Sequence, residues 1–281
     1  MILQNGLKGI RNLETCPGTV GKRILLSVAI ITLNEERKLS ECLASVPFAD
    51  EIVIVDSGSS DGTEVIARSF NADFSVRSFD NFSNQKNAAL DRTGGEWVLF
   101  LDADERLTPE LQEEIKSIIT NPSPHFTYYL KRRNFLFGGR MRFGASLNDW
   151  QLRLVRRGHG QFHGLVHERV QSPNPPGRLR GELIHTTYQT TGEYFLKFNL
   201  FTSLDAENMW KQGKKPTLAH FLFKPTADFF YFYFFRLGIL DGFRGFLYQC
   251  LAVKYLYVKY IKTLALYRQR GYAIDQLKDN K

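Results

Sequence analysis

A short apolar run that ends in two carboxylates is the feature that most constrains this chain. Residues 97–101 (WVLFL) are continuously apolar, and two glycines precede them. Such a run is typical of a buried strand in a parallel sheet. Asp102 and Asp104 follow at the strand's carboxyl end, the edge where open α/β sheets bind ligands. One of the two carboxylates can hold a divalent cation while the other orients water or a sugar hydroxyl. A surface Asp-x-Asp in a loop is the alternative.

Strand-like and helix-like segments alternate through the first 120 residues. The expected strands span residues 24–32, 51–56, 73–77 and 97–101. The expected helices span residues 34–46, 63–70, 83–91 and 108–120, with Asn34 as the cap of the first one. This order predicts a mainly parallel sheet with right-handed crossovers. After residue 126 the pattern predicts a more mixed sheet, with strands at 128–131, 151–155 and 182–184, and then a helix over 193–212.

Amino-acid composition and charge indicate which class of partner the protein binds. Of the 281 residues, 43% are hydrophobic, which is enough to bury a core and argues against disorder. The formal net charge of +8 and the pI of about 9.3 suit an anionic partner: nucleic acid, a membrane surface or a phosphorylated substrate. The three cysteines lack metal-binding spacing and indicate reduced thiols in the cytoplasm. No nucleic-acid motif accompanies the charge, and no uncharged apolar stretch is long enough to predict a spanning helix.

Four motifs, taken in order, carry a resemblance to a known family. They are TLNEE at 32–36, VDSGSSDGT at 55–63, QKNA at 85–88 and LDADE at 101–105. Together they resemble the family 2 inverting glycosyltransferases, which implies the GT-A fold: an α/β, Rossmann-like, mainly parallel sheet flanked by helices. Three later motifs resemble the lipopolysaccharide-core β-1,4-glucosyltransferases of Gram-negative bacteria: DWQLRLVRR at 149–157, VHE at 166–168 and HTTY at 185–188.

The resemblance implies a site for a nucleotide sugar and a cation. It gives Asp104 as the main ligand of Mg²⁺ or Mn²⁺, with Asp102 on the ribose or the metal and His185 as a further metal ligand. A structural hydrogen bond is the alternative role for His185. The UDP-sugar would be bound by residues near the ends of the first strands: Thr32, Asn34, Glu35, Asp56, Lys86, Asp102 and Ala103. Capping of a turn is the competing role for Asp56, although Asp61 and Ser59 suit that role better.

An inverting transfer also needs a base that deprotonates the attacking hydroxyl of the acceptor. The resemblance implies Glu168, in the VHE motif, as this base. Asp149 is the reserve candidate, and it can instead bind the acceptor or pair with Arg153.

The last third of the chain combines aromatic residues with cations. Residues 229–235 are all aromatic, and lysines punctuate the segment that follows. Rings and cations together suit the headgroup region of a membrane, so we expect a helical appendage at 216–281 that lies on an anionic membrane surface. A helical hairpin packed on the catalytic domain, or a dimer surface, is the alternative. The expected order is a flexible lead (1–23), a GT-A domain (24–215, with a donor half 24–105 and an acceptor half 106–215) and this appendage.

The expected function is therefore transfer of a sugar to a membrane-anchored glycan. The resemblance implies UDP-glucose as donor, inner-core heptose of lipopolysaccharide as acceptor, and a peripheral enzyme on the cytoplasmic face of the inner membrane. One alternative is a transferase that acts on polyprenyl phosphate or on another cell-envelope polysaccharide. The second is a non-catalytic GT-A-like binding protein, because a fold does not imply a function. Nucleic acid is not an expected partner.

Overall fold

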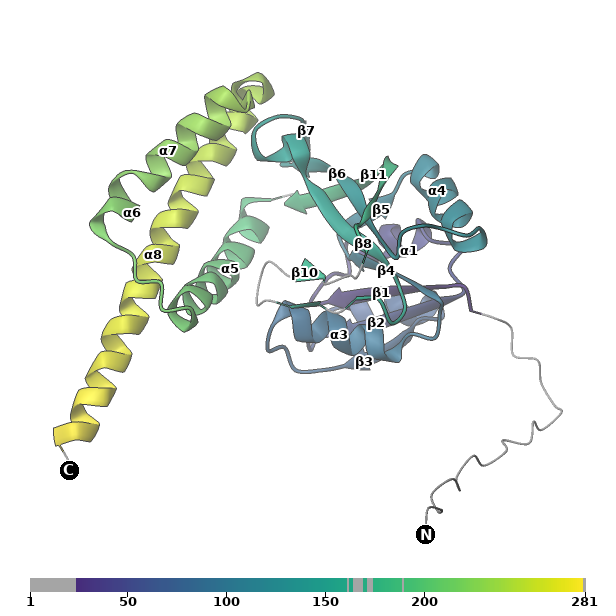
Figure 1. Cartoon of the computed structure of the whole chain (residues 1–281), viewed down its shortest axis with the longest axis horizontal. Helices are drawn as coiled ribbons and strands as arrows, with labels where there is room; N and C mark the ends of the chain where they lie inside the picture. The colour runs from purple at the N-terminus through teal and green to yellow at the C-terminus, as the bar shows by residue number, and fades with distance from the viewer. Residues whose placement is uncertain (1–23, 161, 164–168, 171–173, 189, 280–281) are drawn as a thin grey trace, which may run out of the picture.

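A twisted sheet with helices on its faces forms the first part of the molecule, and a layer of helices follows it (Figure 1). The structure is a computed structural model that describes residues 24–160, 162–163, 169–170, 174–188 and 190–279. The expected lead, residues 1–23, lies outside them. Within the described residues the main sheet has the strand order β3-β2-β1-β4-β8-β6-β11-β5, with β7 paired to β6. The expected class, an α/β sheet with a helical appendage, is confirmed.

The first half of the sheet is parallel, as predicted. Its strands are β1 (Leu26–Thr32), β2 (Glu51–Asp56), β3 (Asp73–Val76) and β4 (Trp97–Asp102). The helices between and after them are α1 (Leu39–Ala44), α2 (Thr63–Ser69), α3 (Phe82–Arg92) and α4 (Pro109–Thr120). The predicted strands and helices agree with these bounds to within two residues, except at the start of α1.

The start of α1 corrects the prediction for Asn34. Asn34 has a φ of +54°, so it sits in a left-handed turn, a conformation that asparagine adopts more readily than most residues. Its side-chain Oδ1 accepts a hydrogen bond from the Ser60 backbone N–H at 2.9 Å, and its own N–H donates to Ser59 Oγ at 2.7 Å. Asn34 therefore ties two loops together, and the helix begins only at Leu39.

The alternation of side chains along β4 determines on which face of the sheet Asp102 lies. Leu99 and Leu101 pack into the larger core, with α1, α2 and α4. Val98 and Phe100 pack into the smaller core on the opposite face, with α3. Because the side-chain period of a strand is two residues, Asp102 continues the row that faces α3.

The second half of the sheet is mixed, as predicted. Its strands are β5 (Glu105–Leu107), β6 (Thr127–Leu136), β7 (Gly139–Met141), β8 (Trp150–Arg156) and β11 (Gly177–Tyr188). A short 3-10 turn, η1 (Gly144–Asn148), precedes β8, and β9 (Phe162–His163) pairs with β10 (Arg169–Val170). β8 is antiparallel to both β4 and β6, so it joins the two halves. The sequence did not predict β5, and it predicted only three of the residues of β11.

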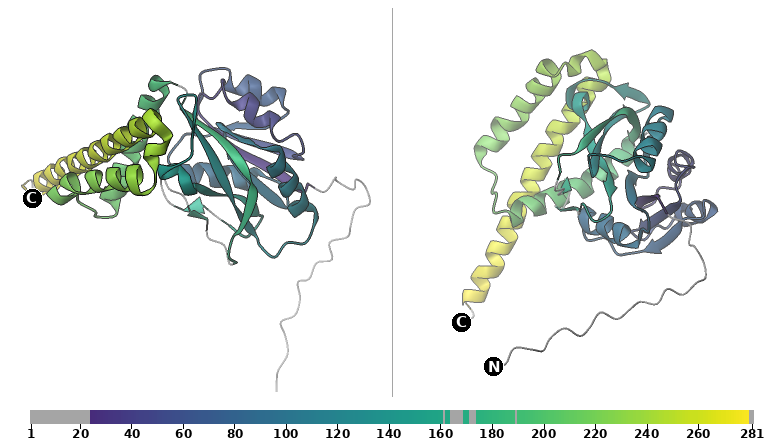
Figure 2. Two further views of the ribbon diagram at one scale, coloured as in Figure 1. Left: turned by 90° about the horizontal axis from the view of Figure 1, so that it is seen from above. Right: turned by 45° about the vertical axis from the view of Figure 1, so that its right-hand side comes forward.

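The helical layer lies beside the sheet (Figures 1 and 2). It consists of α5 (Thr191–Lys211), α6 (Leu218–Leu222), α7 (Lys224–Phe230), the turns η2 (Tyr231–Phe235) and η3 (Gly238–Asp241), and the long α8 (Gly242–Asp279). α5 packs against α8 far more than against the sheet. The helices thus pack together from Thr191 onward, and the expected start of the appendage, residue 216, falls between α5 and α6. No helix among the described residues has the length and apolar character that crossing a membrane requires.

Polar contacts fasten α5 to α8. The ammonium group of Lys262, on α8, donates hydrogen bonds of 2.8–2.9 Å to oxygens of Asn199, Thr202 and Ser203, all on α5. The Tyr255 hydroxyl donates to the Asp205 carboxylate at 2.7 Å. These bonds lie among packed aromatic rings, so the two helices hold one position relative to each other.

Candidate active site

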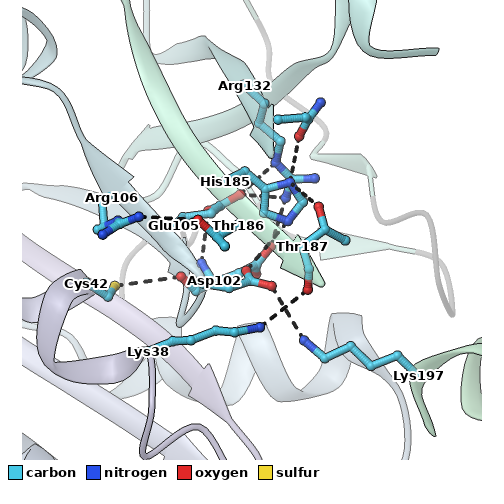
Figure 3. A network of polar contacts seen from close by, with 12 residues as sticks. Lys38, Cys42, Asp102, Glu105, Arg106, Arg132, His185, Thr186, Thr187 and Lys197 are labelled. Carbon is cyan, nitrogen blue, oxygen red and sulfur yellow. Dashed lines mark hydrogen bonds and ion pairs between the residues drawn. The ribbon is translucent and has the colours of Figure 1, made fainter. Parts of the chain in front are cut away.

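A buried cluster of charges closes the end of β4 (Figure 3). Glu105 is fully buried, and its Oε1 accepts hydrogen bonds from Arg132 Nε at 2.7 Å and from Arg153 at 2.6 Å. The same two guanidinium groups donate to Asp102 Oδ2, Arg132 at 2.9 Å. Two carboxylates, one at the end of β4 and one at the start of β5, thus share two arginines from β6 and β8.

Within the cluster, the carboxylate of Asp102 contacts cationic side chains of the protein itself. Lys86 Nζ, on α3, lies 3.6 Å from the other oxygen, Asp102 Oδ1. Burial raises the pKa of Asp102, but Arg153, Lys86 and Arg132 outweigh burial and lower it well below its usual value. Asp102 is therefore ionised and surrounded by cations, so its charge is already balanced without a metal ion.

Asp104 faces a different set of groups. Its Oδ1 lies 3.6 Å from His185 Nε2, and its Oδ2 lies 3.5 Å from Lys197 Nζ. Lys197 Nζ also lies 3.2 Å from Glu35 Oε1 and donates a hydrogen bond to it. β11 fixes the turn, because the Thr186 backbone N–H donates to the Asp104 carbonyl at 3.0 Å.

The pKa values of these groups follow from burial and from their neighbours. Burial raises the pKa of Asp104, but His185 and Lys197 outweigh it, and the net effect is a lowered pKa. Burial also raises the pKa of Glu35, and here it prevails. For Lys197 burial acts to lower the pKa, whereas Asp104 and Glu35 raise it above its usual value. The ammonium of Lys197 therefore stays charged at neutral pH.

A chain of hydrogen bonds fixes which nitrogen of His185 carries the proton. The Asp149 carboxylate can only accept, so Asn134 must present its amide Nδ2 to Asp149 Oδ2, 2.8 Å away. Asn134 Oδ1 then faces His185 Nδ1 at 2.7 Å, which makes Nδ1–H the donor. Burial and Arg132 lower the pKa of His185, whereas the carboxylates of Asp104, Glu105 and Asp102 oppose that shift. Its Nε2 faces Asp104, and there it can bind a cation as a neutral ring or pair with the carboxylate as an imidazolium.

This arrangement fits a hard divalent cation with two protein ligands. His185 Nε2 and a carboxylate oxygen of Asp104 lie 3.6 Å apart, and both are atoms that such a cation accepts as ligands. Among the described residues no three His, Cys, Asp or Glu side chains converge as a metal cage. The remaining ligands would be phosphate oxygens and water, as is common for Mg²⁺ sites.

The predicted nucleotide-binding residues lie at the same edge of the sheet, but several have internal partners. Asp56 is buried, and its carboxylate accepts hydrogen bonds from Thr32 Oγ1, from the Gly58 and Ser59 N–H groups, and from Ser59 Oγ at 2.6–2.8 Å. It thus has the turn-capping role that we expected of Asp61 and Ser59. Asp61 caps a turn too, because its Oδ1 accepts from the Thr63 N–H at 3.1 Å.

The remaining predicted site residues have different surroundings. Glu35 lies at the site through Lys197, and Ala103 is buried in the turn between the two aspartates. Asp149 accepts from two amides, those of Asn134 and Gln151, whereas Arg153 pairs with Asp102 and Glu105. The proposed base, Glu168, lies outside the described residues.

Residues that sequence reasoning missed complete the site. They are Glu105, Arg132, Asn134 and Lys197. One signal was readable: Lys197 falls three residues after Tyr194 and four before Phe201, which places a cation on the apolar stripe of a predicted helix. Nothing local marked Arg132 or Asn134, because their partners lie on other strands.

Comparison with known proteins places the chain in a family. Residues 27–165 match the sequence profile of glycosyl transferase family 2. The lipopolysaccharide core biosynthesis glycosyltransferase LpsC of Rhizobium meliloti (strain 1021) is 31% identical over 257 residues, which cover 85% of this chain and 94% of that protein. The chain belongs to glycosyl transferase family 2. An uncharacterized glycosyltransferase of Rickettsia bellii (strain RML369-C) is 30% identical over 238 residues, 79% of this chain and 80% of that protein.

Some solved structures resemble the chain at lower similarity. S. aureus TarS 1-349 is 17% identical, with a TM-score of 0.42, and the match covers 87% of this chain and 91% of that one. As a family 2 member related to an enzyme of lipopolysaccharide core biosynthesis, the chain is a glycosyltransferase, and inversion is a property of the family.

The buried charge cluster of this family 2 glycosyltransferase predicts an effect of mutation on stability. Glu105→Ala should lower the free energy of unfolding by ~3 kcal/mol, because two buried guanidinium groups would then share Asp102 alone. Urea denaturation followed by tryptophan fluorescence measures the change. The matched control is Glu113→Ala, which removes an exposed partner of Lys116 and should leave stability unchanged. A loss for Glu105→Ala that is no larger than the control's would contradict a stabilising role for the cluster.

Proposed function

We propose that the protein is a metal-dependent inverting glycosyltransferase that transfers glucose from UDP-glucose to a lipid-anchored glycan, the inner-core heptose of lipopolysaccharide. The observation that carries this proposal is the pair formed by Asp104 and His185. His185 Nε2 and a carboxylate oxygen of Asp104 lie 3.6 Å apart, a spacing at which one cation could contact both. Family membership gives the reaction class.

The site also supports the binding of a donor diphosphate. When a sugar leaves its nucleotide, negative charge develops on the diphosphate, and a bound Mg²⁺ or Mn²⁺ would stabilise that charge. Asp104 and His185 would hold the ion. Thr32, Asn34, Glu35 and Asp56 lie near the ends of β1 and β2, and we propose that the loops they organise frame the uracil and the ribose.

The two carboxylates considered as base have different proposed roles. Glu168 remains the proposed base, on the resemblance of the VHE motif. Asp149 is proposed as a positioning residue, because both of its oxygens accept hydrogen bonds from amides and one of these bonds orients His185 through Asn134.

The exposed surface of the helical layer supports an acceptor that is anchored in a membrane. Large apolar side chains are exposed around the turn between α7 and α8, among them Phe235 at 82% and Phe243 at 76%. Arg244 lies beside Phe243 and is exposed as well. We propose that this turn rests on an anionic membrane, at the cytoplasmic face of the inner membrane. The printed role of LpsC, lipopolysaccharide core biosynthesis, supports an acceptor of that kind.

Nucleotide binding tests the donor and the cation together. UDP with Mn²⁺ or Mg²⁺ should raise the melting temperature of the wild type, by an amount that corresponds to about 2.7 kcal/mol at a hundredfold excess over Kd. EDTA should abolish the shift, and Asp104→Ala should lose it. GDP, ADP and CMP should give smaller shifts. Asp73→Ala, which removes a carboxylate at the far edge of the sheet, is the control and should behave as the wild type. A UDP shift that persists in Asp104→Ala would count against the metal site.

The orientation of His185 predicts an effect of Asn134. Asn134→Leu should weaken Mn²⁺ binding by about 10- to 100-fold, because the imidazole loses the bond that fixes its tautomer. Asp149→Asn should act in the same direction, since Asn134 could then rotate its amide. Titration of Mn²⁺ by electron paramagnetic resonance, without nucleotide, gives both affinities. Asn121→Leu, at the end of α4, is the control. Unchanged Mn²⁺ affinity in Asn134→Leu would contradict this role.

The exposed turn predicts binding to vesicles. The wild type should sediment with vesicles that contain a quarter anionic lipid, and less so with neutral ones or at high salt. Phe235→Ser with Phe243→Ser should weaken binding at least about tenfold, because each buried ring contributes roughly 1.5–3 kcal/mol. Val65→Ser with Val76→Ser removes equally exposed apolar side chains from α2 and β3 and serves as the control. Equal binding by the two double variants would exclude the turn as the contact.

A further inference from the structure

We propose that Lys197 binds the diphosphate of the donor, so that helix α5 completes the nucleotide-sugar site. This inference rests on the proposed function, because it assumes a donor with a diphosphate. It assigns to a residue outside the family motifs a direct contact with the substrate.

Lys197 holds its present position through two carboxylates. Its ammonium nitrogen lies 3.2 Å from Glu35 Oε1 and 3.5 Å from Asp104 Oδ2. Those carboxylates are largely buried, with 15% and 8% of their side-chain surface exposed, whereas 32% of the Lys197 side chain is exposed. The Lys197 side chain therefore lies between the buried acidic groups and the solvent. Figure 3 shows it entering from α5, opposite Arg132.

The neighbouring cations are directed elsewhere. Lys38 lies on the same side of the cluster, but its ammonium donates to the Thr187 carbonyl and pairs with Glu193. Arg132 and Arg153 pair with Asp102 and Glu105 on the far side of the turn. Among these four cations, Lys197 is the one that contacts Asp104.

The two oxygens of Asp104 separate Lys197 from the proposed cation. His185 lies beside Oδ1 and Lys197 beside Oδ2, so a cation held at Oδ1 leaves the lysine in place. A phosphate that shares such a cation with Asp104 comes within reach of the ammonium, because lysine carries its charge on a flexible four-carbon stem. A bound dication also weakens the hold of Asp104 on Lys197, which frees the ammonium for the phosphate.

The proposed contact would act on the leaving group. In the transfer, the bond between the anomeric carbon and the β-phosphate oxygen breaks, and its electron pair stays on the phosphate. The acceptor oxygen forms the new bond and gives its proton to the base. An ammonium beside the phosphate stabilises the charge that develops there, and that stabilisation grows as the bond breaks.

Binding measurements separate this role from a structural one. Calorimetry should give UDP affinity in the presence of Mn²⁺, and Mn²⁺ affinity alone, for the wild type, Lys197→Met and Lys197→Arg. We expect Lys197→Met to weaken UDP binding at least tenfold, with Mn²⁺ binding unchanged or tighter because a competing cation is gone. Lys197→Arg should stay within a few fold of the wild type. Lys211→Met, at an exposed pair with Glu207 on the same helix, should match the wild type.

Other outcomes overturn the inference. UDP affinity of Lys197→Met within threefold of the wild type would exclude contact with the diphosphate. A parallel loss of Mn²⁺ and UDP binding, with a lower melting temperature, would show that the lysine only holds the two carboxylates. If the wild type binds Mn²⁺ but no UDP, the proposed donor fails, and the inference fails with it.

Discussion

The charge cluster at the end of β4 is the interaction on which the rest of the site depends. Two arginines, one on β6 and one on β8, pair with two carboxylates, one at the end of β4 and one at the start of β5. Buried charges require partners, so the mixed strands must lie in one register for the cluster to form. Because Asp102 is held in this way, Asp104, two residues later, is turned toward β11, where His185 lies. The position of the proposed cation is thus a consequence of a salt-bridge network that the cation does not join.

The parallel half of the fold was predictable because its signals are local. Buried strands, such as residues 97–101, carry continuous apolar runs, and helix α4 begins with a threonine cap and a proline. The same holds for Asp102 and Asp104, whose place at a strand end follows from the residues on either side. The roles of the two aspartates did not follow, since these depend on which side of the turn each faces. The metal and nucleotide assignments remain proposals.

What the sequence did not reveal depends on partners far away along the chain. β5 has three residues, two of them charged, and becomes a strand only because β11 pairs with it. Asn34 has the composition of a helix cap, yet the loop at Ser59 and Ser60 competes for its hydrogen bonds. In both cases a tertiary contact outweighed a local preference.

The bonds between α5 and α8 connect the catalytic domain to the C-terminal helices. Lys262 and Tyr255 hold α5 from the outside, while Lys197 joins the same helix to Asp104 and Glu35. A catalytic domain that is truncated or replaced after residue 215 would keep every family motif. It would nevertheless lose α8, which supports α5, the helix that carries Lys197. The contacts of Lys197 with Asp104 and Glu35 therefore depend on the C-terminal helices as well as on the catalytic sheet.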